Sequence, residues 1–105
     1  MSLSGKKLGL LISAGPDRPN FRHGVRTAAA ALDQGLSVYL YCIDDATAGV
    51  DDPKLQALRS RGLKFYACAY GAQRRNLPLT DRANFAGLTI VNDLIAATDR
   101  FVSFN

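Results

Sequence analysis

The chain has 105 residues, of which 48% are hydrophobic and 21% charged, and this composition is typical of one globular domain rather than of a disordered chain. No apolar run approaches the ~20 residues that a membrane helix needs, so we expect no membrane partner. The net charge of +4 reflects basic residues, mostly arginine, that are scattered without a dense run, which argues against nucleic acid as a partner.

Residues 1–5 are small and polar, and we expect them to form a flexible N-terminus before a single domain at 6–105. No charged-then-apolar signal segment opens the chain, so the expected compartment is the cytoplasm. The two cysteines, Cys42 and Cys68, are too few for a disulfide framework and lack metal-ligand spacing. A reducing compartment would keep both as thiols, and we expect no cofactor.

The first half of the chain alternates between strand and helix patterns. Residues 7–13 form a continuous apolar run, as expected for a strand that helices cover on both faces. A loop of turn-forming residues follows, and Asn20 is placed to cap a helix that runs to Asp33, with Gly35 as its left-handed terminal residue. Residues 36–42, rich in β-branched and aromatic side chains, predict the second strand.

The second half continues the alternation. Asp52, followed by Pro53, predicts the start of a short helix that ends at Gly62. Residues 79–86 follow no clear period. The other predicted elements are a strand at 63–68, a brief helix at 69–76, a helix with an apolar face over 88–98 and a strand at 100–104.

This order predicts a single-domain, three-layer α/β sandwich with a mainly parallel sheet of four to five strands, because helical crossovers join parallel strands. Ligand sites in such sheets lie beyond the carboxyl ends of the strands. The rule selects the loop after Ser13, the loop after Cys42 and the turn at Cys68.

Cys68 is the first candidate for chemistry, because it ends a strand and immediately precedes a helix. Unpaired backbone N–H groups and the positive end of the helix dipole would favour its thiolate there. Arg74 and Arg75, one to two turns further on, would add positive potential. The alternative is a buried cysteine that acts as a small apolar residue.

Cys42 ends the second strand in the same way, but the acidic pair Asp44 and Asp45 follows it and would raise the pKa of its thiol. With the first strand between the second and third, the two cysteines would lie ~9.6 Å apart. That separation exceeds the ~7 Å that a disulfide spans. We therefore interpret Cys42 as a structural residue.

The loop after the first strand is a candidate anion site, since it leads to a helix N-terminus. Ser13, Gly15 and Asp17 are its candidate binding residues, although the loop lacks P-loop or dinucleotide-binding spacing. His23, the only histidine, falls on the polar face of the following helix. It is a further candidate binding residue, and the alternative is a solvated surface side chain.

Three segments together resemble the DsrE/DsrF-like family of sulfur-relay proteins, which includes TusD-type and YchN-type members. They occur in family order and are SAGPDRPNFRHGVRTAAAALDQGLSVYLY at 13–41, RGLKFYACAYGAQRRNL at 61–77 and GLTIVNDLIAATDRFVSF at 87–104. The resemblance implies a DsrE-like α/β domain that assembles as a trimer or hexamer.

In the active branch of the family, a cysteine at the end of the third strand carries sulfane sulfur as a persulfide, and Cys68 is the matching position. The resemblance therefore implies a sulfur-relay protein that takes sulfur from a donor protein and passes it to the thiol of an acceptor protein. The loop ISAGPDRP departs from the hydroxyl-rich turn of many relatives, and several branches lack the cysteine. The alternative function is a non-catalytic small-ligand-binding or assembly subunit.

Overall fold

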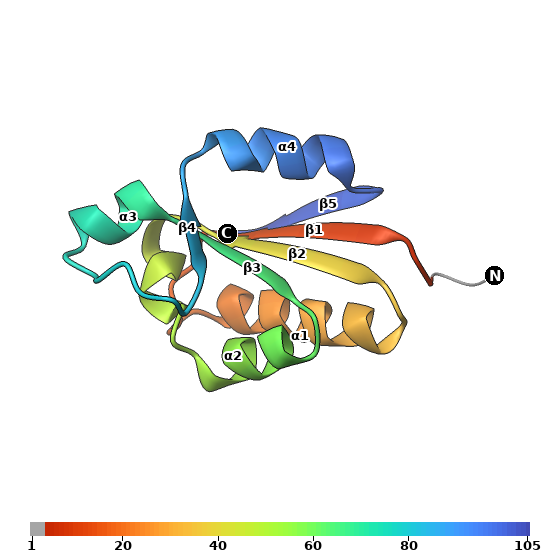
Figure 1. Cartoon of the computed structure of the whole chain (residues 1–105). Helices are drawn as coiled ribbons and strands as arrows, with labels where there is room; N and C mark the ends of the chain where they lie inside the picture. The colour runs from red at the N-terminus through yellow and green to blue at the C-terminus, as the bar shows by residue number, and fades with distance from the viewer. Residues whose placement is uncertain (1–3) are drawn as a thin grey trace.

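Five strands and four α-helices make up residues 4–105, the part of the chain that the computed structural model describes (Figure 1). The strands are β1 (Lys7–Ile12), β2 (Ser37–Cys42), β3 (Lys64–Cys68), β4 (Asn84–Ala86) and β5 (Arg100–Phe104). The helices are α1 (Pro19–Asp33), the 3₁₀ helix η1 (Asp44–Gly49), α2 (Pro53–Ser60), α3 (Ala69–Arg74) and α4 (Thr89–Ala97). No helix in this part of the chain is long and apolar enough to cross a membrane.

The strands form one sheet in the order β4-β3-β2-β1-β5, and every neighbouring pair is parallel. The predicted parallel sheet of four to five strands is thus confirmed. The expectation that β1 separates β2 from β3 is wrong, because β2 pairs directly with β3 and β1 pairs with β2 and β5. The chain adds strands in sequence from β1 to β4 and then returns to place β5 on the other side of β1.

Helices cover both faces of the sheet, which confirms the predicted three layers. Figure 1 shows α1 and α2 against one face, α4 against the other, and α3 beyond the carboxyl ends of the strands. Because both faces are covered, β1 is apolar at consecutive positions, as the sequence predicted. Leu10 and Ile12 belong to the larger core on the α1 and α2 side, whereas Leu11 packs with the cluster on the α4 side.

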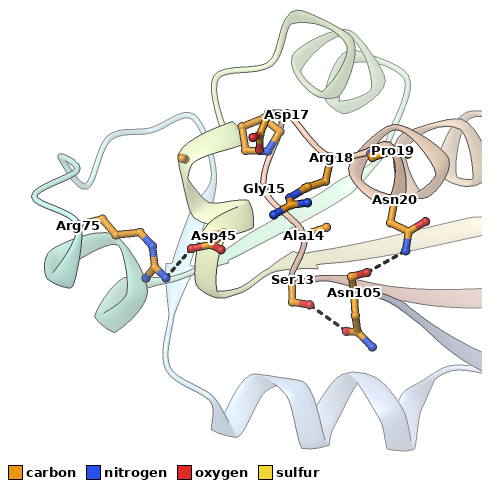
Figure 2. Close-up of a pocket in the computed structure, with 12 residues that line it drawn as sticks. Ser13, Ala14, Gly15, Asp17, Arg18, Pro19, Asn20, Asp45, Arg75 and Asn105 are labelled. Carbon is orange, nitrogen blue, oxygen red and sulfur yellow. Dashed lines mark hydrogen bonds and ion pairs between the residues drawn. The ribbon is translucent and has the colours of Figure 1, made fainter.

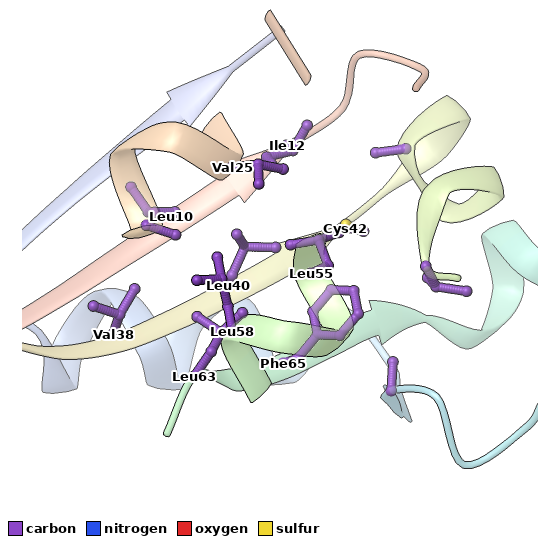
Figure 3. Close-up of a cluster of buried hydrophobic side chains, with 14 of the residues drawn as sticks. Leu10, Ile12, Val25, Val38, Leu40, Cys42, Leu55, Leu58, Leu63 and Phe65 are labelled. Carbon is purple, nitrogen blue, oxygen red and sulfur yellow. The ribbon is translucent and has the colours of Figure 1, made fainter. Parts of the chain in front are cut away.

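The two faces have packed cores of unequal size. The larger one joins the sheet to α1 and α2 through side chains such as Leu40, Leu55 and Phe65 (Figure 3). The smaller one contains Tyr41, Cys68 and Leu94 and lies under α4. Cys68 therefore belongs to the smaller core, on the α4 side of the sheet.

The predicted helix ends around α2 and after α1 are correct. Asp52 caps α2, since its Oδ1 accepts hydrogen bonds from the N–H groups of Lys54 and Leu55 at 2.8 and 3.3 Å. Gly35 and Gly62 take positive φ angles of 82° and 107° after α1 and α2, as expected of glycine there.

Asn20 does not cap α1, because the helix begins at Pro19 and its N-cap residue is Arg18, which makes no side-chain cap. The Asn20 side chain is engaged elsewhere, since its Nδ2 donates to the Asn105 carbonyl at 2.8 Å. A contact 85 residues along the chain thus replaces the local one that the sequence suggested.

Two further boundaries differ from the prediction. The helix after Cys68 ends at Arg74 rather than at residue 76. The segment without a clear period contains β4, a three-residue edge strand paired with β3. Residues 1–3 of the expected flexible N-terminus lie outside the described residues, and the N–H of Gly5 donates to the Gly35 carbonyl at 3.2 Å.

Candidate functional site

Cys68 is the last residue of β3 and the N-cap residue of α3, so its side chain lies where the strand backbone turns into the helix. Its Sγ accepts a hydrogen bond from the N–H of Gly71 at 3.3 Å. The residue is only 3% exposed. Since α3 has just six residues, this local amide, rather than a long helix dipole, is the main polar group that the backbone directs at the sulfur.

A cleft of about 390 Å³ opens over Cys68. Arg74 and Arg75 both border it, so the structure brings the two predicted arginines to the cysteine. The other residues around the cleft are Ile43, Asp44, Tyr70, Gly71 and Leu88.

The two arginines are held differently. Arg75 is fixed, because its guanidinium donates to the Gly71 carbonyl at 3.1 Å and pairs with Asp45 Oδ1 at 2.9 Å. Arg74 lies over the Tyr70 ring, with its guanidinium carbon 5.7 Å from the ring centroid. The Asp45 carboxylate offsets the charge of Arg75, whereas Arg74 forms no ion pair within residues 4–105 and shares the cleft with the Asp44 carboxylate.

Tyr41 is a site residue that the sequence interpretation missed. Its side chain is fully buried on the same face of the sheet as Cys68, and its hydroxyl donates to the Ala86 carbonyl at 3.1 Å. The pKa of Tyr41 is raised well above its ordinary value, first by burial and then by its hydrogen bond and charge interaction with Cys68. The only available signal was a hydroxyl-bearing side chain beside Cys42, which also fits an ordinary strand.

Cys42 points into the opposite core. It pairs in register with Ala67, so Cys68, one residue further along β3, faces the other side of the sheet. Figure 3 shows Cys42 among the side chains of the larger core, where it is fully buried. Burial raises the pKa of the Cys42 thiol, and Asp52 adds to the effect, rather than the Asp44 and Asp45 pair that we expected.

A second and larger cleft, of about 800 Å³, lies at the loop after β1 (Figure 2). Ser13, Gly15 and Asp17, the predicted binding residues of this loop, all line it. The Ser13 hydroxyl donates to Asn105 Oδ1 at 2.8 Å, which ties the loop after β1 to the residue after β5. Arg75 borders both clefts, so they are neighbours along one edge of the sheet.

His23 borders neither cleft. It is exposed on α1, and its Nδ1 lies 3.2 Å from Asn20 Oδ1. Within residues 4–105 no group of three or more His, Cys or Asp side chains is arranged to hold a metal ion. The thiol at this edge is that of Cys68, with the Gly71 N–H and two arginines around it, and the polar second cleft lies beside it.

We expect iodoacetamide to alkylate Cys68 much faster than Cys42, because only the Cys68 sulfur borders a cleft. Tyr41→Phe removes a hydroxyl beside that sulfur. The rate at Cys68 should then fall only a few-fold, because this hydroxyl must exchange its bond to the Ala86 carbonyl for one to the thiolate, and a net hydrogen bond contributes roughly 0.5–1.5 kcal/mol. Peptide mass mapping measures both rates. Tyr66→Phe is the matched control, as Tyr66 is the register partner of Tyr41, and equal losses in the two variants would contradict the assignment.

The raised pKa of Cys42 also predicts how stability depends on pH. In the unfolded chain this thiol ionises near its ordinary value of 9.0, while in the folded protein it stays protonated. The unfolded state then binds fewer protons, so the free energy of unfolding falls above about pH 9, by up to ~1.4 kcal/mol per pH unit. Urea titrations at several pH values above 9 measure this free energy. It should fall less steeply with pH in Cys42→Ala than in the parent, and an equally steep fall would refute the burial argument.

The DsrE/DsrF-like family model matches residues 6–104 of the chain. No curated protein sequence matches this chain. Among solved structures, the YchN protein from E. coli superposes with a TM-score of 0.77 at 21% identity, over 95% of this chain and 99% of that one. This likeness confirms the predicted fold, and the family match confirms the resemblance seen in the sequence. The chain belongs to the DsrE/DsrF-like family.

Proposed function

We propose that the protein is a sulfur carrier, which takes sulfane sulfur as a persulfide on Cys68 and transfers it to a partner thiol. Membership of the DsrE/DsrF-like family supports a role in sulfur relay. The observation that carries the proposal is the position of the Cys68 sulfur, which receives the Gly71 N–H at 3.3 Å and borders a cleft with two arginines.

The transfer is a thiol exchange. The Cys68 thiolate attacks the outer sulfur of a donor persulfide, a new S–S bond forms, and the S–S bond of the donor breaks. The donor leaves as a thiolate with the electron pair of that bond. An acceptor thiolate then attacks the outer sulfur on Cys68 in the same manner, so neither step needs an oxidant, a metal or an organic cofactor.

The residues around the sulfur support both steps. The Gly71 N–H stabilises negative charge on Sγ, both before loading and when Cys68 leaves as a thiolate. The buried Tyr41 hydroxyl interacts with the same sulfur. Arg74 attracts the anionic outer sulfur of the persulfide and the thiolates of the donor and the acceptor.

The exposed rim of the cleft suits protein partners. Tyr70 and Leu88 are large apolar side chains that are 65% and 56% exposed beside Cys68. Aromatic and arginine side chains are enriched in protein interfaces, and Arg74 lies over Tyr70 here. We assign this rim to the sulfur donor and acceptor proteins, and we place the protein in the reducing cytoplasm, where its thiols stay free.

Incubation with inorganic polysulfide should add one sulfur atom to the intact protein, as measured by mass spectrometry. Cys68→Ala should abolish the gain and Cys42→Ala should keep it, because Cys42 is fully buried in the opposite core. A reductant should remove the added atom. If no sulfur is gained, or if the gain persists in Cys68→Ala, the carrier function is wrong.

We also infer that the chain assembles with copies of itself as a trimer or a hexamer. One nine-residue helix, α4, covers its face of the five-stranded sheet. Apolar side chains remain exposed on both faces of the molecule: Ile95 of α4 is 49% exposed, and Val102, which faces the α1 side of the edge strand β5, is 42% exposed. Association would cover the exposed apolar groups.

Light scattering at micromolar concentration tests the assembly. We expect a mass of three or six chains, independent of the oxidation of either thiol, since the exposed groups are apolar. A mass near 11.3 kDa, that of one chain, would show that the protein does not assemble.

A further inference from the structure

The order of the strands creates one topological switch point, between β1 and β5. From β1 the chain crosses through α1 to β2, and it reaches β5 through α4, on the opposite face of the sheet. The strand order reverses at this point, and ligands in open α/β sheets bind there, beyond the carboxyl ends of the strands. Cys68 lies at a different place, at the end of β3.

The larger of the two clefts described above coincides with this point. Ser13 follows β1, Asn105 follows β5, and both line the cleft of about 800 Å³ (Figure 2). That volume lies within the range of small-molecule sites. The cleft is also held open by fixed polar groups, because the Ser13 hydroxyl and the Asn20 amide both donate to Asn105. We call it the switch-point cleft.

The side-chain charges of the switch-point cleft balance. Two carboxylates, Asp17 and Asp45, and two guanidinium groups, Arg18 and Arg75, line it. Asp45 and Arg75 neutralise each other at 2.9 Å. The Asp17 and Arg18 side chains take no hydrogen bond or ion pair within residues 4–105, and Figure 2 shows both at the cleft. One free negative group and one free positive group suit a ligand that carries one of each, and a polyphosphate would meet no excess of positive charge.

We propose that the switch-point cleft binds an amino-acid-type zwitterion, with Arg18 holding its carboxylate and Asp17 its ammonium group. The shared residue Arg75 places this cleft next to the one over Cys68. Resting on the proposed function, the zwitterion is a cysteine-type thiol in its persulfide form, a small-molecule donor that loads Cys68 in addition to the donor proteins. Cys68 bonds to the outer sulfur of this persulfide, the S–S bond of the donor breaks, and the cysteine-type thiolate leaves with the electron pair.

Binding is tested without sulfur transfer by using S-methylcysteine, which has the zwitterion but no thiol. Calorimetric titration should show one site per chain. Arg18→Gln and Asp17→Asn should each weaken the binding by about tenfold or more, as expected for losing a hydrogen bond between charged groups. Arg22→Gln, an exposed arginine of α1 outside the cleft, is the matched control and should bind as the parent does. N-acetylation of S-methylcysteine removes its ammonium charge and esterification removes its carboxylate charge, so each should also weaken the binding.

Other outcomes overturn the proposal. If S-methylcysteine does not bind, or if sulfate or the N-acetylated probe binds as well, the cleft is not a zwitterion site. Retained binding in Arg18→Gln and Asp17→Asn would also refute the assignment of these residues.

The link to Cys68 is tested by loading kinetics, read as mass gain on the intact protein. Arg18→Gln should raise the half-saturating concentration of cysteine persulfide by a larger factor than that of inorganic polysulfide, which carries no zwitterion. Equal factors would overturn the donor assignment. The two proposals can fail separately. If polysulfide loads Cys68 but S-methylcysteine does not bind, only the zwitterion site is wrong. If S-methylcysteine binds but no donor loads Cys68, the carrier function is wrong, and the ligand is then not a sulfur donor.

Discussion

The parallel pairing of β2 with β3 is the constraint on which the site depends. In this register Cys42 lies beside Ala67, and strand residues alternate between the two faces, so Cys42 and Cys68 face opposite sides of the sheet. A slip of one residue would exchange the faces. The observed register buries Cys42 between the sheet, α1 and α2, and it brings Cys68 to the Tyr41 side of the sheet at a cleft.

Local sequence signals predicted the parts of the fold that local forces determine. The apolar strands, the Asp52 cap and the turn glycines formed as expected, since each depends on neighbouring residues. The position of β2 beside β3 could not be predicted, because strand order depends on which faces pack together. The Asn20 side chain forms a long-range hydrogen bond to Asn105 instead of capping its own helix. The three residues of β4 are too few to show the alternation of side chains that identifies a strand.

The candidate site was predictable in part for the same reason. Cys68 and its arginines share one strand end and the helix that follows, and the structure brings them to one cleft. Tyr41 comes from another strand, so only the sheet register puts its hydroxyl near the sulfur. Asp45 and Arg75 are 30 residues apart, and Arg75, which this ion pair holds in place, borders both the Cys68 cleft and the switch-point cleft. One edge of the sheet thus presents a thiol and a polar cleft side by side.

A carrier must release its sulfur as well as accept it, so release is the most direct test of the account. Protein loaded with one sulfur atom and freed of donor is mixed with an excess of an acceptor thiol, and both species are followed by mass spectrometry. The account predicts that Cys68 loses the atom and that the acceptor gains it in equal amount as a persulfide or its trapped derivative. Sulfur that stays on the protein while the acceptor remains unmodified would contradict it.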